Sequence, residues 1–410
     1  MRLKRGIFRQ PVLLFILCFS AGNGITQSRI APVRSVTVPF HFTDNRVFID
    51  LTLLRADGIP RTARFWVDTG GGSFLMAEPL ARDLGLDLSG PVSEGDEGER
   101  FASVKSTPQV RLGIMGIDLK DVRAAVVLGK KTIGPGIDAE GLFPGHLLAR
   151  YQVVFDYLAR EFTLALPGTL KMKGTRLSTP VSEKWGFARM EAQIEGKSYG
   201  FLLDSGAAYT MVSQQVLDDW RSTHPDWAVL NGAVGAANMV GDFDPKALML
   251  RLPKVAFGPL QITGVGVVSR RAGMFEHWMS RDMTAPIIGA IAGNVLRGFR
   301  VQIDYAQGAT YLEQTGKLDS TDLDTIPLIL NPQADGTYVV SGVAQQAGQP
   351  LMEGIAVGDK LVNIDSFAVD GKSLGEVLDA LRGKPGQIRN LVLERGGKQI
   401  TVFARVIHLL

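Results

Sequence analysis

Asp68-Thr69-Gly70 and Asp204-Ser205-Gly206 are two copies of one tripeptide in a chain of 410 residues. An apolar stretch precedes each copy, at residues 65–67 and 201–203, and small residues follow each. Self-similarity at two distant positions indicates a duplicated structural unit. One buried carboxylate is only a polar residue, whereas two carboxylates delivered by two copies of one unit can face each other across a pseudo-twofold axis.

The repeat continues beyond the tripeptides. Residues 140–157 align without a gap on residues 288–305, so that glycines and an Asp-Tyr pair coincide, and the second copy carries a short insertion between its two motifs. Asp156 and Asp304 therefore also recur. Each follows strand residues and precedes a tyrosine, which favours a structural role at a turn over catalysis.

Each tripeptide carries groups suited to acid–base chemistry. The apolar residues before the aspartate bury a strand, so the carboxylate emerges into surroundings of low dielectric constant. The hydroxyls of Thr69 and Ser205 can hydrogen-bond to the backbone of the other unit. Gly70 and Gly206 let the backbone approach closely and adopt unusual torsion angles. Two carboxylates held together share one proton, so one member can activate a water while the other protonates a substrate carbonyl.

These motifs resemble the retropepsin-like aspartic protease family, in the duplicated bacterial form that carries a C-terminal PDZ domain. The family pattern matches residues 202–207, 287–289 and 299–305 of the second copy. The first copy departs from the pattern at Gly71, where alanine is usual, and at Glu140, where an apolar residue is usual.

The resemblance implies a mainly β fold of two acid-protease lobes related by pseudo-twofold symmetry. It implies Asp68 and Asp204 as the catalytic pair, and a peptide or protein as the substrate. The supporting residues of that active site are Thr69, Gly70, Ser205 and Gly206. The expected activity is that of an aspartic endopeptidase.

Residues 326–410 differ in character and resemble a bacterial PDZ domain. Residues 373–381 have the periodicity of an amphipathic helix, and residues 389–405 read as a closing hairpin. Such domains bind an extended peptide as an added strand. The resemblance therefore implies a C-terminal peptide as ligand beside Tyr338, Val339 and Val340; the alternative is a docking domain that binds no free peptide.

The N-terminus has the pattern of a secretory signal, with a basic region, an apolar run and then small residues. We expect residues 1–28 to be removed, the cleavage point being open, with an uncleaved anchor as the alternative. The only cysteine, Cys18, lies in this segment, so the exported chain has no disulfide and no thiol nucleophile. Without its four basic residues the formal charge changes from +3 to −1, which gives no reason to expect nucleic-acid binding.

The sequence thus predicts a periplasmic or secreted protein of a bacterial envelope, with no membrane span in the mature chain. Its expected parts are a first lobe at 29–168, a second lobe at 177–315 and a PDZ domain at 326–410. Polar loops at 93–100 and 231–242 are expected to be mobile, and the Arg270-Arg271 doublet to lie in a solvated loop. The five histidines lack the spacing of metal ligands, so no metal and no other cofactor is expected.

Two other classes of function stay open. The first is a catalytically silent peptide-binding scaffold with an aspartyl-protease fold, and the intact aspartates favour the enzyme over it. The second is a glycosidase that uses two carboxylates, although the repeated tripeptide has no role in that chemistry.

Overall fold

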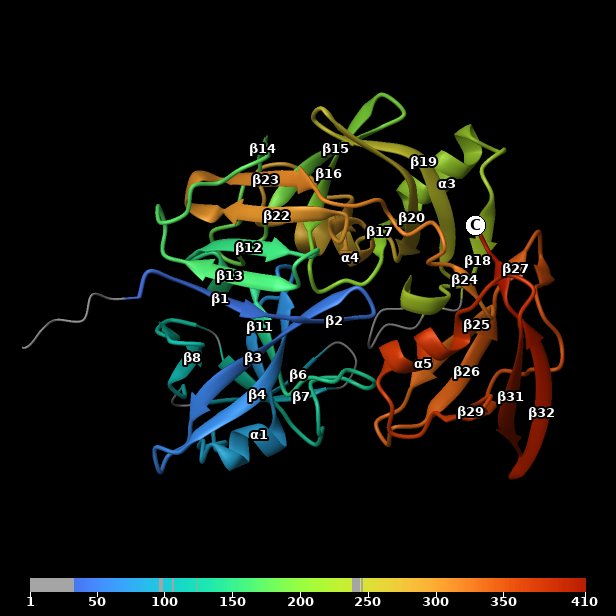
Figure 1. The fold of residues 1–410 in the computed structure, drawn as a ribbon, viewed down its shortest axis with the longest axis horizontal. Helices are drawn as coiled ribbons and strands as arrows, with labels where there is room; N and C mark the ends of the chain where they lie inside the picture. The colour runs from blue at the N-terminus through green and yellow to red at the C-terminus, as the bar shows by residue number, and fades with distance from the viewer. Residues whose placement is uncertain (1–32, 96–98, 105–106, 123, 238–243, 245) are drawn as a thin grey trace, which may run out of the picture. The chain divides into compact units, whose positions relative to one another are not determined.

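The computed structural model describes residues 33–95, 99–104, 107–122, 124–237, 244 and 246–410. The expected signal segment at 1–28 lies outside these residues, as do parts of both loops expected to be mobile, at 96–98 and 238–242. The described chain is mainly β, as predicted (Figure 1). Within the described residues, no helix is long and apolar enough to span a membrane.

The first tripeptide lies at the end of β4, in a sheet ordered β6-β7-β10-β5-β11-β4-β3-β8-β9. In its centre, β11 runs parallel to β4 and antiparallel to β5, and β10 runs parallel to β5. The strands β8 and β9 form a hairpin, because Gly113 turns the chain with a φ of 54°. The strands are β2 (His41–Thr43), β3 (Arg46–Leu54), β4 (Pro60–Asp68), β5 (Phe74–Ala77), β6 (Val92–Glu94), β7 (Arg100–Ser103), β8 (Val110–Leu112), β9 (Met115–Ile117), β10 (Ala124–Val127) and β11 (Gly141–Pro144).

The second tripeptide follows β16 in a sheet with the same central pairings. Here β21 runs parallel to β16 and antiparallel to β17, and β20 runs parallel to β17. A helix follows the strand after each tripeptide, α1 (Glu78–Asp83) in the first sheet and α3 (Gln214–Thr223) in the second. The strands of this sheet are β15 (Arg189–Ile194), β16 (Lys197–Leu203), β21 (Gly289–Ile291), β17 (Thr210–Ser213), β20 (Leu260–Arg270), β19 (Leu248–Phe257), β18 (Val229–Asn231), β27 (Gln345–Gln346) and β28 (Gln349–Pro350).

A third sheet joins the two copies. Its order is β1 (Ser35–Pro39), β13 (Glu161–Ala165), β12 (Gln152–Asp156), β22 (Phe299–Asp304), β23 (Ala309–Gln314) and β14 (Thr175–Ser178). The repeated strands β12 and β22 pair antiparallel at its centre. Asp156 accepts a hydrogen bond from the Ala159 N–H, and Asp304 accepts one from the Gln307 N–H. These contacts confirm the structural turn role expected of both aspartates.

The C-terminal residues form their own sheet and core. The expected helix and hairpin are confirmed as α5 (Leu374–Leu381), which Ser373 caps, and the pair β31 and β32. The sheet contains β25 (Leu328–Pro332), β26 (Tyr338–Val343), β29 (Lys360–Ile364), β31 (Ile388–Arg395) and β32 (Lys398–Arg405), with β30 (Phe367–Ala368) beside β29.

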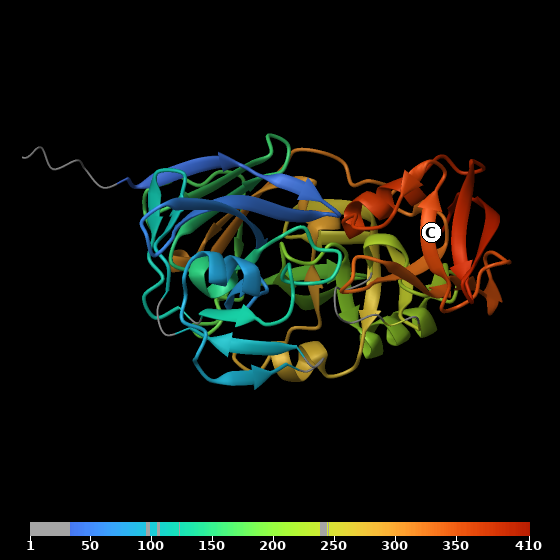
Figure 2. The same ribbon diagram turned by 90° about the horizontal axis from the view of Figure 1, so that it is seen from below.

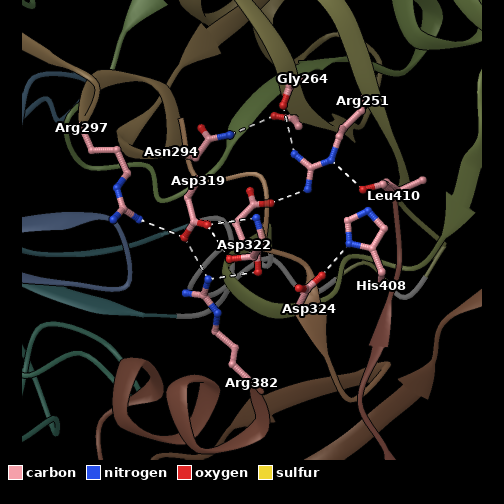
Figure 3. Close-up of polar contacts among 12 residues, drawn as sticks. Arg251, Gly264, Asn294, Arg297, Asp319, Asp322, Asp324, Arg382, His408 and Leu410 are labelled. Atoms are coloured by element: carbon pink, nitrogen blue, oxygen red, sulfur yellow. Dashed lines mark hydrogen bonds and ion pairs between the residues drawn. The ribbon is translucent and has the colours of Figure 1, made fainter. Parts of the chain in front are cut away.

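The C-terminal segment also contacts the rest of residues 33–410, which form one compact unit. Leu409 and Ala344 belong to the same hydrophobic cluster as Leu230 of β18. Arg251 of β19 donates to the carbonyl of Leu410 at 2.7 Å, and Asp319 pairs with both Arg297 and Arg382 (Figure 3). Apolar and ionic contacts therefore connect the segment after residue 326 to earlier parts of the chain.

Strand addition beside Tyr338, Val339 and Val340 is not available in this structure. β25 pairs with all three residues on one side of β26. On the other side β29 pairs with Tyr338 and Val339, and Val340 exchanges hydrogen bonds with Asp359 and Gly358. The expected peptide site fails here because both edges of the strand already have backbone partners.

Candidate active site

Asp68 and Asp204 come together because two buried strands end at the same place. Phe65 and Val67 of β4 and the apolar end of β16 are almost fully buried, which fixes where each strand delivers its aspartate. The Asp204 N–H donates to the carbonyl of Ile291 at 2.9 Å, so the neighbouring strand β21 holds this end in place. Asp204 is buried, whereas Asp68 retains some exposure. The two carboxyl groups lie close enough together that, after burial, the charge of Asp204 raises the pKa of Asp68.

Thr69 and Ser205 tie the two strand ends together, in the contacts that the sequence analysis expects. The Thr69 hydroxyl donates to the Leu203 carbonyl at 2.7 Å and accepts from the Ser205 N–H at 2.9 Å. The Ser205 hydroxyl donates to the Val67 carbonyl at 2.9 Å and accepts from the Thr69 N–H at 3.2 Å. Both side chains are completely buried, so these four bonds are shielded from water.

Gly70 and Gly206 are required for space. Neither has a positive φ, so the unusual torsion angles expected at these glycines are absent. A Cβ on Gly70 would lie 2.9 Å from the carboxyl carbon of Asp204, and one on Gly206 would lie 2.3 Å from Oδ1 of Asp68. Gly71 is constrained in the same way, since its Cβ would lie 2.7 Å from Oδ2 of Asp68. The carboxylates thus occupy the volume that these side chains would need.

The surroundings of the two carboxyl groups are unequal. Asp204 accepts hydrogen bonds from the N–H groups of Gly206 at 2.9 Å and Ala207 at 3.0 Å, whereas Asp68 accepts one from Gly70 at 2.9 Å. Burial, followed by the charge of Asp204, raises the pKa of Asp68 well above its usual range. Burial also raises the pKa of Asp204. Backbone N–H groups oppose the rise at both carboxyls, whereas the charge of Arg46 lowers only the pKa of Asp204. The pair is therefore suited to share one proton.

A cavity of about 170 Å³ opens beside the pair. Both aspartates and both supporting glycines line it, together with apolar side chains from β16, β17 and η2 (Met274–Met279). Those apolar side chains are Leu202, Met211, Met274, Phe275 and Met279. A polar reacting group placed at the aspartates would thus lie against an apolar wall.

Two arginines that the sequence analysis left aside also line this cavity. Arg270 is buried rather than solvated, and it donates to the Ala237 carbonyl at 2.6 Å, which corrects the expectation of a solvated loop. Arg46 is also buried. No local pattern separates these arginines from surface arginines in the sequence; only the Asp44-Asn45 pair before Arg46 signals a tight hairpin.

Other expected site features lie away from this cavity. Tyr338 is buried in the C-terminal core, where its hydroxyl donates to the Lys372 carbonyl at 2.7 Å. Across the described ranges, no group of three or more His, Cys, Asp and Glu side chains is placed to hold a metal ion.

No family model matches the chain, and no curated protein matches it. Among solved structures, the chain is similar to the crystal structure of an aspartic proteinase from Irpex lacteus. The two are 13% identical with a TM-score of 0.40, and the match covers 68% of this chain and 97% of that chain.

Proposed function

We propose that the protein is an exported aspartic endopeptidase of the retropepsin-like type, with one active site between two lobes related by a pseudo-twofold axis. The observation that carries the proposal is the close pair of Asp68 and Asp204 in one cavity, delivered by two equivalent strands and held by reciprocal bonds of Thr69 and Ser205. Paired carboxyls that share a proton serve as acid and base in one step.

The unequal surroundings of the two carboxyl groups favour distinct roles. In the proposed reaction, ionised Asp204 takes a proton from a water whose oxygen bonds to the peptide carbonyl carbon. Protonated Asp68 gives its proton to the carbonyl oxygen. When the C–N bond breaks, the amine nitrogen takes the proton held by Asp204 and Asp68 regains one from a hydroxyl of the tetrahedral intermediate. The proton count then returns to its starting value.

The proposal is tested by digestion of a peptide library, read by mass spectrometry, with the wild type and with Asp68→Asn and Asp204→Asn. Each variant is expected to lose hydrolysis while keeping the fold, because a single carboxyl cannot act as both acid and base. A pepstatin-type inhibitor is expected to raise the melting temperature of the wild type. Inhibitor and peptide binding without cleavage would instead identify a catalytically silent scaffold, and retained cleavage in either variant would place the active site elsewhere.

For the C-terminal segment we propose regulation of access to the active site. Support comes from two contacts of this segment, whose ribbon is orange to red in Figure 2. The Leu374 N–H donates to the Gly136 carbonyl at 2.9 Å, and Gly375 packs against Thr43 at the β2–β3 turn. A Cβ on Gly375 would lie 2.2 Å from Cγ2 of Thr43. Gly375→Ala is thus expected to loosen this contact and to raise cleavage of short and long peptides alike. Slower cleavage of long peptides alone would indicate a tethering role.

Export to the periplasm or the exterior is likewise a proposal, which rests on the N-terminal sequence pattern. Expression of the full chain with fractionation, followed by N-terminal sequencing of the product, tests it. A product that starts near residue 29 in the envelope or medium is expected. An intact N-terminus in the membrane fraction would indicate the uncleaved anchor.

A further inference from the structure

Arg46 is a buried cation placed next to the aspartates by a tight turn. Thr43 pairs with Arg46 across the β2–β3 hairpin, and the two residues between them, Asp44 and Asn45, have φ values of 51° and 56°. Two positive φ values in a two-residue loop are characteristic of a type I′ turn, which Asp and Asn tolerate. β3 therefore begins with Arg46, whose side chain is 2% exposed.

The guanidinium of Arg46 reaches across to the second copy of the tripeptide. Its Nε donates to the carbonyl of Gly206 at 3.1 Å, and it forms an ion pair with Asp44. It also lies over the ring of Trp66, 5.4 Å from the ring centroid. Because the N–H of Gly206 donates to Asp204, Arg46 holds the same short backbone segment that holds the Asp204 carboxylate.

The second lobe has no such cation at the equivalent position. Continuing the β3–β4 register, in which Phe48 faces Trp66, places Arg46 opposite Asp68. Continuing the β15–β16 register in the same way places Phe187 opposite Asp204. Phe187 is a buried aromatic residue. The first copy thus has an arginine where the second has an aromatic ring, and this arginine contacts the backbone beside Asp204.

We propose that Arg46 is a positioning residue that makes Asp204 the ionised member of the aspartate pair. The inference rests on the proposed function and extends it by assigning the asymmetry of the pair to one side chain. A positive charge near a carboxylate favours its ionised form, and this effect is strong where water is excluded.

Other charged or titratable groups also face Asp204. The hydrogen bond from Asp68 and the charge of Arg46 both lower the pKa of Asp204, against the larger effect of burial. Tyr157 is close enough that, after burial, the Asp204 charge raises the pKa of its hydroxyl. Arg270 lines the same cavity, but its guanidinium contacts a backbone carbonyl of η1 (Gly235–Ala237). Arg46 is therefore the cation whose removal should act on Asp204.

Asp44 must be considered together with Arg46. Burial raises the pKa of Asp44, and Arg46 opposes that rise. Removing only the arginine would leave a buried carboxylate without its partner, which is strongly destabilising. Arg46→Met is therefore paired with a second variant, Asp44→Asn with Arg46→Gln, which removes both charges and keeps polar side chains.

The direct test is a titration of Asp204 in protein labelled with ¹³C at the aspartate carboxyl carbons. Asp204→Asn assigns the resonance. In both Arg46-deficient variants we expect Asp204 to titrate at higher pH than in the wild type, and in Arg46→Lys, which keeps the charge, to titrate close to the wild type. The matched control is Arg189→Met, which removes a buried arginine that contacts Pro286 and Glu191 in the second lobe. An unchanged Asp204 titration in a folded Arg46-deficient variant would overturn the proposal.

Peptide hydrolysis provides a second readout that separates the two proposals. Loss of the charge should move the acid limb of the pH profile of kcat/KM to higher pH, since that limb reports ionisation of Asp204. A merely structural arginine would lower activity without moving the limb. If the wild type cuts no peptide but the variants show a shifted Asp204 titration, the proposed function is contradicted and the proposed role of Arg46 is supported. If the wild type is active but the acid limb stays at the same pH in the variants, the proposed function is supported and the proposed role of Arg46 is contradicted.

Discussion

The hydroxyls of Thr69 and Ser205 each accept a hydrogen bond from the other residue's backbone N–H, at 2.9 and 3.2 Å. Each hydroxyl also donates to the carbonyl just before the other aspartate. The ends of β4 and β16 are thus fixed to each other by groups that do not titrate. The spacing of the two carboxyl groups consequently depends on side chains that take no part in proton transfer.

Removal of either hydroxyl should be costly. Thr69→Val and Ser205→Ala each leave a buried N–H and a buried carbonyl without this partner, which costs about 1–3 kcal/mol per unsatisfied group. Urea unfolding measures the loss. The control is Thr37→Val, whose hydroxyl contacts Thr163 at an exposed position and should change stability little. Equal effects for Thr69→Val and Thr37→Val would show that the buried bonds contribute no more to the free energy of unfolding than an exposed hydroxyl contact does.

The double variant of Thr69 and Ser205 gives a sharper test. Because the two hydroxyls share partners, the combined loss should differ from the sum of the single losses. Strict additivity in urea unfolding would indicate two independent contacts rather than one connected set.

Because Asp68 is buried beside the carboxyl group of Asp204, the free energy of unfolding should depend on pH. Its pKa in the folded protein lies well above the unfolded value of 3.8. The stabilising contribution is therefore present below pH 3.8 and is lost as pH rises through the folded pKa, with each unit of difference worth about 1.4 kcal/mol. Asp68→Asn should be more stable than the wild type at neutral pH, by a margin that shrinks towards pH 4.

Thermal unfolding across pH 4–8 measures this margin. Asp138→Asn is the control, because it alters an aspartate that is 71% exposed and lies outside the pair. It should follow the wild type across the range. A constant difference between Asp68→Asn and the wild type at all pH values would contradict a raised pKa at Asp68.

A larger side chain beside the aspartates should not fit without moving a carboxyl group. In Gly206→Ala the new methyl group would lie 2.3 Å from Oδ1 of Asp68, so the carboxyl group must move. We expect hydrolysis to be lost and stability to fall by about 1–3 kcal/mol, as for other overpacked sites. Gly116→Ala is the control in another strand, since no atom lies within 4 Å of its Cβ. Wild-type hydrolysis by Gly206→Ala would rule out this tight approach.

The end of the chain should stabilise the second sheet. Leu409 is 4% exposed in a cluster with residues of the second sheet, so Leu409→Ala should cost about 2–5 kcal/mol in urea unfolding. Phe403→Ala, in the same C-terminal segment but 74% exposed, should cost far less. Similar effects for the two variants would show that the segment folds without support from the second lobe. Removal of residues 326–410 is accordingly expected to lower the stability of the remainder as well.

Local sequence patterns were sufficient to predict several parts of this protein. The helix at Leu374–Leu381 follows from the spacing of apolar residues around a capping serine. The repeated tripeptides predicted which two carboxyls meet, because a duplicated unit brings equivalent positions to equivalent places. The hydroxyl contacts of Thr69 and Ser205 were predictable for the same reason.

Sequence patterns failed where the outcome depended on neighbours distant in the chain. Whether an edge of β26 is free depends on β25 and β29, and both are paired with it. No sequence pattern indicated that Leu409, near the end of the chain, shares a hydrophobic cluster with Leu230 of β18. Arg270 reads as a surface residue, yet it is buried against η1.

Repetition in the sequence was enough to predict that Asp68 and Asp204 meet, and the family resemblance was enough to predict a mainly β architecture. The difference between the surroundings of the two carboxyl groups appears only in three dimensions. Arg46 comes from a turn far from Gly206 in sequence, and Phe187 takes the equivalent position in the other lobe. Charge asymmetry at a buried site is a property of three-dimensional proximity, because the field of one guanidinium acts on whichever carboxyl the fold brings nearest.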